Sequence, residues 1–247
     1  AEYRQRLADL LRYKYAGKQI GLIVTVHTDG LNFLLDEGKG LCPEAPVFSY
    51  LIVRPELIEA KNPGRRILQR PQNWDAGGTL EIALKIFPET RKVVFIAGTA
   101  AGDRRFEYEA KRIFEPWRAR LEFEYTSDLS LEEMLQLVAS LPPQSIVIYD
   151  NVFSDRTGRT FTPLEVGKMV AKAAKVPAFC LWDTLMGSGF IGGSLLSFEA
   201  EGDYAAHIAL DILSRNILLT KPVTTLPPDK TFMFDWRQLK HWGLNVD

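Results

Sequence analysis

The sequence predicts an α/β protein built from parallel sheets flanked by helices. Apolar runs with the length of buried strands alternate along the chain with segments of helical period. The connections between them are short, which favours right-handed crossovers that return each strand parallel to the one before it. With 247 residues, of which 46% are hydrophobic and 25% charged, the chain has ordinary globular composition and enough apolar material for a sizeable core.

The first predicted helix spans Glu2–Tyr15 and carries Leu7, Leu10 and Leu11 on one face. No strand precedes this helix. The elements predicted next are a strand at Ile20–Val26, a helix from about Gly30 capped by Thr28 or Asp29, a strand at Val47–Val53, a polar loop containing Lys61–Gly64, a helix over Ala76–Phe87 with Asp75 as N-cap, and a strand at Lys92–Ala97.

The second half continues the alternation. Its predicted elements are a helix over Asp103–Trp117, a strand at Leu121–Tyr125, a helix opened by the capping box Ser130–Glu133, a strand at Ser145–Tyr149, a helix opened by Thr162–Glu165 with Pro163 in first position, a strand at Ala178–Leu181, an extended segment at Gly192–Phe198, a helix over Ala200–Arg215, a strand at Thr231–Phe234 and a short helix from Trp236. Leu219–Asp229, with three prolines, is the one linker-like stretch.

Charge and cysteine content exclude several function classes. Thirty basic and thirty-one acidic residues give a net charge of -1, so no overall field favours nucleic acid. Cys42 and Cys180 lie far apart without CxxC spacing or nearby histidines, so we expect two buried small apolar residues, no metal site and no cofactor. No apolar run reaches the roughly 18 to 20 residues of a membrane span.

The pattern Gly187-Ser-Gly189-Phe-Ile-Gly192 matches the glycine spacing of dinucleotide-binding folds, but its context does not. That fingerprint needs a helix opening within it, whereas here an extended segment follows. We therefore expect a turn that re-enters a sheet.

Open parallel sheets bind ligands at the carboxyl ends of their strands, and this rule selects the candidate site. The candidate ligand-binding residues that follow predicted strands are His27, Thr28, Tyr50, Thr99, Ala100, Asn151, Phe153, Trp182 and Asp183. In the small-residue run Gly98–Gly102, backbone N–H groups at a helix start could hold an anion, and a plain tight turn is the alternative.

The remaining candidates also have structural alternatives. Asp183 is suited to a ligand ammonium group, and Trp182 and Phe153 to stacking on an apolar group. Each could instead be a helix cap or a core aromatic, and His27 could cap the next helix. Together Asp183 and the Gly98–Gly102 turn suit an amino acid or small carboxylate.

An enzyme is the rival hypothesis. Asp150 and Asp183 follow neighbouring strands and could form a carboxylate pair for acid–base chemistry. No GxSxG, HExxH or GxxxxGK[ST] motif accompanies them, and the chain has only three histidines. We therefore expect no catalytic residues.

The C-terminal 150 or so residues contain five segments of distinctive sequence: Thr162–Glu165, Val176–Phe179, Asp183–Gly193, Ser197–Ala206 and Phe232–Gly243. In these segments and in their order the chain resembles type I periplasmic-binding-protein-like domains related to the ABC-transporter substrate-binding family, including extracytoplasmic sensor domains of bacterial histidine kinases.

The resemblance implies a two-lobed clamshell that holds a small molecule between its lobes. The first lobe would comprise residues 1–88 with 190–247, and the second 89–189. Such domains begin with a strand, helix and strand that have no counterpart here, which raises the alternative of a first lobe truncated at its N-terminus.

The implied function is sensing outside the cytoplasmic membrane, with a membrane-anchored signalling partner in the same polypeptide. Segment Asp155–Pro163 and the C-terminal Phe232–Gly243 favour a sensor of the histidine-kinase kind. An ABC uptake binding protein and the effector half of a cytoplasmic regulator are the alternatives.

Overall fold

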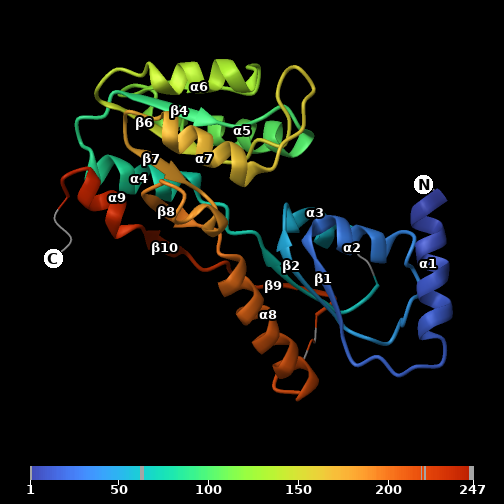
Figure 1. The fold of residues 1–247 in the computed structure, drawn as a ribbon. Helices are drawn as coiled ribbons and strands as arrows, with labels where there is room; N and C mark the ends of the chain where they lie inside the picture. Colours follow the sequence, from blue (N-terminus) through green and yellow to red (C-terminus); the bar gives the residue numbers. More distant parts are fainter. Residues whose placement is uncertain (1, 62–63, 218, 220, 245–247) are drawn as a thin grey trace. The chain divides into compact units, whose positions relative to one another are not determined.

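The computed structural model describes residues 2–61, 64–217, 219 and 221–244. The chain falls into two compact units (Figure 1). Unit 1 comprises Ala1–Asn73 and Phe198–Asp229, and unit 2 comprises Trp74–Ser197 and Lys230–Asp247.

These boundaries correct the predicted lobes 1–88 with 190–247 and 89–189. Helix α4 (Ala76–Ile86) packs against strand β8 (Gly192–Leu195), which pairs antiparallel with β10 (Thr231–Phe234). The prediction assigned all three elements to the first lobe. Their mutual contacts place them in unit 2 instead.

Unit 1 is a parallel sheet with helices on both faces. Its strands, in the order β1-β2-β3-β9, are β1 (Ile23–Val26), β2 (Val47–Ile52), β3 (Ile67–Pro71) and β9 (Val223–Thr225). Its helices are α1 (Glu2–Tyr15), α2 (His27–Leu35), α3 (Pro55–Ala60) and α8 (Phe198–Leu213).

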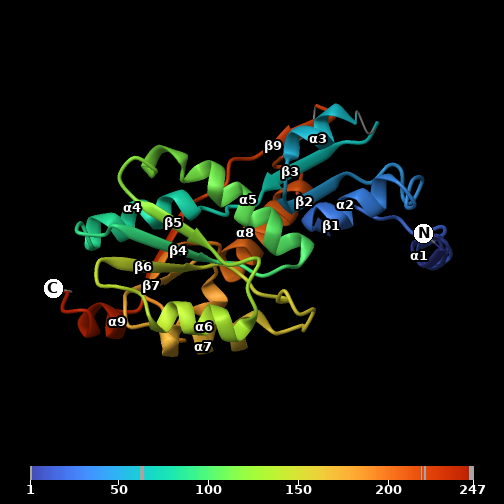
Figure 2. The same cartoon turned by 90° about the horizontal axis from the view of Figure 1, so that it is seen from above.

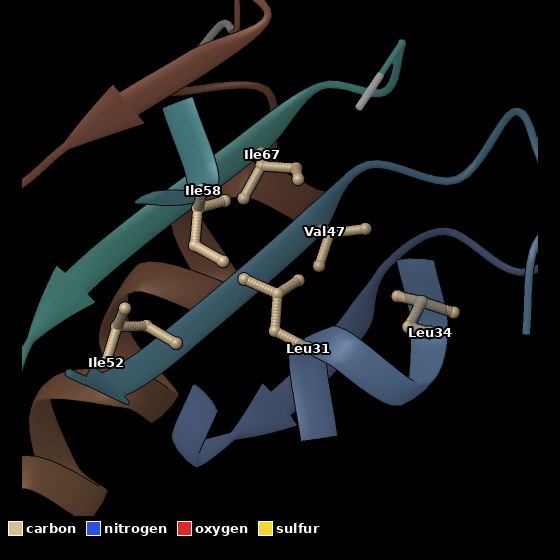
Figure 3. Packing of buried hydrophobic residues seen from close by; sticks show 6 residues of the cluster. All are labelled: Leu31, Leu34, Val47, Ile52, Ile58 and Ile67. Carbon is tan, nitrogen blue, oxygen red and sulfur yellow. The ribbon is translucent and has the colours of Figure 1, made fainter. Parts of the chain in front are cut away.

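Two apolar clusters cover the two faces of this sheet. Figure 3 shows the first, in which side chains of α2 and α3 meet those of β2 and β3: Leu31, Leu34, Val47, Ile52, Ile58 and Ile67. In the second, Phe48 and Leu68 pack against Ala205 and Ile212 of α8. Successive strand residues such as Val47 and Phe48 therefore serve opposite faces, as the period of two requires.

Unit 2 is a second parallel sheet, in which β5, β4, β6 and β7 lie side by side in that order (Figure 2). The strands are β4 (Lys92–Ile96), β5 (Glu122–Tyr125), β6 (Ser145–Tyr149) and β7 (Ala178–Cys180). Helix α5 (Ala101–Ile113) contacts α4, whereas α6 (Leu131–Ala139) contacts α7 (Pro163–Ala173). The chain passes from β4 to β5 and then returns in the opposite direction to β6. Because both crossovers are right-handed, the α4–α5 pair and the α6–α7 pair lie on opposite faces of the sheet.

Short-range signals predicted most elements correctly. Asp75 caps α4 by accepting the N–H of Gly78, and Ser130 and Glu133 form the predicted capping box. The final helix is α9 (Trp236–His241), as expected. The Thr162–Glu165 segment was expected to open α7 with a capping box and with Pro163 in first position. Pro163 is the first residue of α7, but the Thr162 side chain makes no capping hydrogen bond, so the capping box is wrong.

Other predictions fail for identifiable reasons. Helix α3, strand β3 and strand β9 lie where a polar loop and a proline-rich linker were expected; Asn62 and Pro63 of that loop lie outside the described residues. Helix α1 has the predicted bounds, but Leu10 on its expected apolar face is 59% exposed, and Ala8 is buried instead. Cys180 is buried, whereas Cys42 is only half-buried.

Candidate functional site

Asp150 is the centre of a polar and aromatic cluster at the carboxyl edge of the unit 2 sheet. It directly follows β6 and is completely buried. One of its oxygens, Oδ1, accepts the indole N–H of Trp74 and that of Trp182, each at 2.9 Å. Its other oxygen, Oδ2, is buried without a hydrogen-bond partner among the described residues.

Burial raises the pKa of Asp150 to about 7, and the two indole N–H groups only partly offset the cost of desolvating its charge. The negative charge of Asp103 adds to this rise. Asp103 is itself buried, and desolvation raises its pKa as well, although it accepts the backbone N–H of Phe153. Two buried carboxyls therefore lie behind this edge of the sheet.

The aromatic rings of the cluster contact one another. Phe106 of α5 lies 4.9 Å from Trp74 in a tilted arrangement and 5.7 Å from Trp182 edge to face, both measured between ring centroids. Trp182 is 8% exposed, whereas Trp74 and Phe106 are half-buried. We call Trp74, Phe106 and Trp182 the aromatic wall.

Asn151 joins the wall to the sheet. In the amide orientation that satisfies both of its groups, its oxygen accepts from Trp182 Nε1 at 2.9 Å and its nitrogen donates to the Asp150 carbonyl at 3.1 Å. Trp182 therefore has two acceptors, Asp150 and Asn151, within reach of one N–H. The sequence predicted that Asn151 follows a strand, but it did not predict these hydrogen-bond partners.

Asp183 follows β7 and a short 3-10 turn begins at it. Its Oδ2 accepts the hydroxyl of Ser197 at 2.8 Å, and its N–H donates to the carbonyl of Leu196. Its Oδ1 is buried without a hydrogen-bond partner in the described chain. One carboxylate oxygen is thus left to accept a further donor.

The turn after β4 is more fully engaged than predicted. The N–H groups of Gly98 and Thr99 donate to the carbonyls of Asn151 and Ser154, at 3.0 and 2.8 Å. The Thr99 hydroxyl contacts the Ser154 hydroxyl at 2.8 Å and the Asp155 carbonyl at 2.9 Å. These groups fix the turn to the loop after β6 and are not directed at an anion.

Phe153 lies on that loop and is 50% exposed. The loop is braced by Asp155, which accepts the N–H groups of Leu131 and Thr157 and pairs with Arg159 at 2.7 Å. Phe153 is therefore an exposed aromatic side chain on a well-anchored support.

In unit 1, the predicted residues fall into different roles. His27 follows β1 with a left-handed φ of 65°, and its Nδ1 lies 3.4 Å from Asp29. Thr28 does not cap α2: its hydroxyl accepts the N–H of Val53 at 2.8 Å and donates to the Val53 carbonyl. Tyr50 stacks on Phe48 and belongs to the α8-facing core.

The glycine pattern at 187–192 has a structural explanation. Strand β8 starts at Gly192, which confirms that an extended segment follows the pattern. A Cβ on Gly192 would lie 1.9 Å from the carbonyl oxygen of Met233 in β10. The glycine therefore permits the close approach of two strands, which is not a dinucleotide-binding role.

Other features of the described residues do not extend the predicted site. Two cavities lie in unit 1, away from the predicted site residues. The lining of one, of about 540 Å³, includes Arg66 and Ile212, and the lining of the other, of about 800 Å³, includes Leu35 and Lys39. No group of three or more His, Cys, Asp or Glu side chains among the described residues is placed to hold a metal ion. Within the same residues, no helix is long and apolar enough to cross a membrane.

Sequence reasoning missed two members of the cluster and the role of a third. Trp74 stands before a helix and not after a strand, and Phe106 lies in the second turn of α5. Asp150 was selected because it follows a strand, but its role as the acceptor of two indole N–H groups was not predicted. No local pattern distinguishes Trp74 and Phe106, because their proximity to Asp150 depends on the packing of α4 and α5 beside the sheet.

No family model and no curated protein matches the chain. Solved structures do match over nearly its whole length. The ligand-free, open structure of CD0873, a substrate-binding protein with adhesive properties from Clostridium difficile, has a TM-score of 0.69 at 17% identity, covering 100% of this chain and 80% of that one.

Two further matches contain ligands. An ABC domain from Streptococcus pneumonia in complex with L-Trp has a TM-score of 0.59 at 13% identity, covering 99% of this chain and 82% of that one. A periplasmic solute-binding protein from Actinobacillus succinogenes with bound D-allose has a TM-score of 0.55 at 12% identity, covering 96% and 84%.

These structures are type I periplasmic binding proteins, the solute-binding components of ABC transporters. The chain therefore has their fold, an α/β architecture with parallel sheets flanked by helices, as the sequence predicted.

Proposed function

We propose that this chain is an extracytoplasmic domain that binds a small molecule and serves as the sensor of a membrane-anchored signalling protein of the histidine-kinase kind. The observation that carries the proposal is the cluster of Asp150, Asn151, Asp183 and aromatic side chains at the carboxyl edge of the unit 2 sheet. This is the edge at which open parallel sheets bind ligands. The chain also shares its fold with solute-binding proteins along its whole length.

The ligand we propose is an amino acid or a similar small zwitterion. Asp183 Oδ1 is a buried acceptor that has no hydrogen-bond partner among the described residues, and an ammonium group would satisfy it. An unsatisfied buried carboxylate oxygen costs free energy, so a ligand that donates to it gains affinity. The comparison structures bind L-Trp in one case and D-allose in another, so both amino acids and sugars belong in the test.

Binding would act as a signal through linkage. A ligand that binds one conformation of the domain better than another shifts the population between them by its differential affinity. In a sensor, the membrane-anchored part of the polypeptide would read that shift. An uptake binding protein would use the same physics and pass the ligand to a transporter.

An enzyme that uses Asp150 and Asp183 has less support. Asp150 is completely buried, and both indole N–H groups converge on one of its oxygens. A general base must reach the proton that it abstracts, directly or through one water. We therefore propose that the domain has no catalytic activity.

A thermal-shift screen against amino acids, small carboxylates, sugars and purines tests ligand binding. A ligand at 100 times its dissociation constant adds about 2.7 kcal/mol of stability. Asp183→Asn should abolish the shift given by a cationic or zwitterionic hit, whereas Asp128→Asn, at a side chain that is 86% exposed, should not. An equal shift in both variants would refute the assignment of Asp183.

The sensor and transport roles are separated by the sequence that flanks this domain in its gene. Sensing requires a transmembrane segment and a kinase module in the same polypeptide. An uptake protein would stand beside transporter genes, and a regulator would carry a DNA-binding helix-turn-helix.

A further inference from the structure

A cavity of about 540 Å³ lies at the amino edge of the unit 1 sheet. Three of its lining residues stand just before strands of that sheet: Gly21 before β1, Pro46 before β2 and Arg66 before β3. Parallel sheets bind their usual ligands at the other edge, where the strands end. The cavity is therefore separate from the candidate site described above, and none of the predicted site residues lines it.

The end of helix α8 forms the other side of this cavity. Its apolar side chains Ile212 and Leu213 line the cavity, together with Ile217 shortly after the helix. Leu213 is 54% exposed, so its apolar surface is accessible. A Cβ on Gly21 would lie only 2.8 Å from Leu213 Cδ2, which shows that the helix end and the sheet edge meet here. The lining is therefore mainly apolar.

Two exposed arginines, Arg66 and Arg215, supply the charge of the cavity, and no acidic side chain among the described residues lines it. Neither guanidinium forms an ion pair within the described part of the chain, and the Arg66 side chain donates to the Glu44 carbonyl at 3.4 Å. A guanidinium carries five donors, so most of them are available for an anion.

The helix dipole explains only one of these two charges. Arg215 follows the C-terminal end of α8, where a cation is stabilised by the helix dipole even without a ligand. Arg66 precedes a strand and has no such partner. A pair of cations beside apolar surface therefore remains to be explained.

We propose that this cavity is a second binding site of the domain, for an anion whose carboxylate or phosphate head is joined to an apolar chain. The head would pair with Arg66 and Arg215, and the chain would contact Ile212, Leu213 and Ile217. Small-molecule sites usually have volumes of about 300 to 1,000 Å³ and a mainly apolar lining with a few polar groups. This site is independent of the ligand proposed for unit 2.

The test is calorimetric titration of the whole domain with four probes: decanoate, decyl phosphate, acetate and decyltrimethylammonium, each below its micellar concentration. We expect at least one of the two long-chain anions to bind saturably. Acetate lacks the chain and decyltrimethylammonium lacks the negative charge, so both should bind at least about tenfold more weakly. Equal binding of either control probe, or no saturable binding of the long-chain anions, would overturn the proposal.

Variants then assign the two arginines. The double variant Arg66→Gln with Arg215→Gln should bind the long-chain anion about tenfold more weakly, whereas Arg66→Lys with Arg215→Lys should stay within about threefold of the unmodified domain. Arg91→Gln is the matched control, because Arg91 is an exposed arginine that precedes β4 in unit 2. Unchanged affinity in the double glutamine variant, with melting temperatures that show folded proteins, would overturn the role of the arginines.

Two further measurements locate the site and the source of the anion. Asp183→Asn should leave the affinity for the long-chain anion within about twofold, and a large loss there would place the anion in unit 2 and overturn the proposal. Cosedimentation with phosphatidylglycerol vesicles, lost in the double glutamine variant, would support the proposal with a membrane lipid as the anion. Binding of the free anions without cosedimentation would support it with a soluble amphipathic anion.

Discussion

The carboxylate of Asp150 accepts the indole N–H of Trp182 at 2.9 Å, and both groups are buried. A carboxyl at the end of a buried strand is thereby used to hold an aromatic ring. The pKa of Asp150, raised by desolvation to about 7, reflects the free-energy cost of keeping it charged there. This relationship connects the stability of unit 2 with the geometry of its candidate site.

Stability should therefore depend on pH through Asp150. Its folded-state pKa lies near 7, above the unfolded value of about 3.9, so between these values the folded state retains a proton that the unfolded state has lost. The free energy of unfolding should fall as pH rises through this window and level off above it. Asp150→Asn should remove this dependence and be more stable than the unmodified domain by up to about 4 kcal/mol at pH 8.

Urea denaturation at pH 5, 6, 7 and 8 measures this difference. Asp103 titrates in both proteins with a raised pKa, so only the difference between the two curves reports Asp150. A difference that stays constant from pH 5 to 8 would show that Asp150 does not titrate in this range.

Gly98 should tolerate no side chain. A Cβ there would lie 2.4 Å from the Ser154 carbonyl oxygen and 2.5 Å from Asp103 Oδ2. Gly98→Ala should therefore destabilise the domain by about 3 kcal/mol or more, because backbone and a buried carboxyl must both shift. Gly102→Ala is the control: nothing lies within 4 Å of its Cβ, and it should be neutral or stabilising by about 0.5 kcal/mol. Thermal melts compare the two, and similar losses would contradict the steric argument.

In unit 1, Arg70 and Glu201 form a buried ion pair between β3 and α8. Arg70 Nε lies 2.9 Å from Glu201 Oε2, with Arg70 2% and Glu201 5% exposed. Glu201→Ala should destabilise the domain by about 3 to 5 kcal/mol, because it leaves a buried guanidinium without its main partner. The double variant Arg70→Met with Glu201→Leu should recover most of that loss. If the double variant is no more stable than Glu201→Ala, the loss arises from packing and not from the unpaired charge.

The sequence predicted those parts of the fold that depend on local signals. The Asp75 cap, the Ser130–Glu133 box and the apolar strands β4 and β6 each require only a few neighbouring residues. Strand β3 was not predicted because two of its buried side chains, Gln69 and Arg70, are polar and interrupt the apolar pattern that is typical of a buried strand. Their partners, Thr225 and Glu201, are more than 100 positions away in the chain.

The sequence predicted the location of the candidate site at the strand ends, but not the contacts within it. The rule of strand carboxyl ends placed Asn151, Phe153, Trp182 and Asp183 at one edge of unit 2, because parallel strands end together. The rule did not select Trp74, which lies 76 positions before Asp150 in the sequence and donates its indole N–H to the Asp150 carboxylate. Nor could it foresee that the Thr28 hydroxyl is bonded to Val53.

The most direct test of the central claim is calorimetric titration of the purified domain with the compounds that stabilise it in the thermal-shift screen. We predict saturable binding with one ligand per chain, lost in Asp183→Asn and retained in Asp128→Asn. A domain that binds no compound of a broad metabolite panel, in a preparation that melts cooperatively, would contradict the assignment of this chain as a small-molecule sensor.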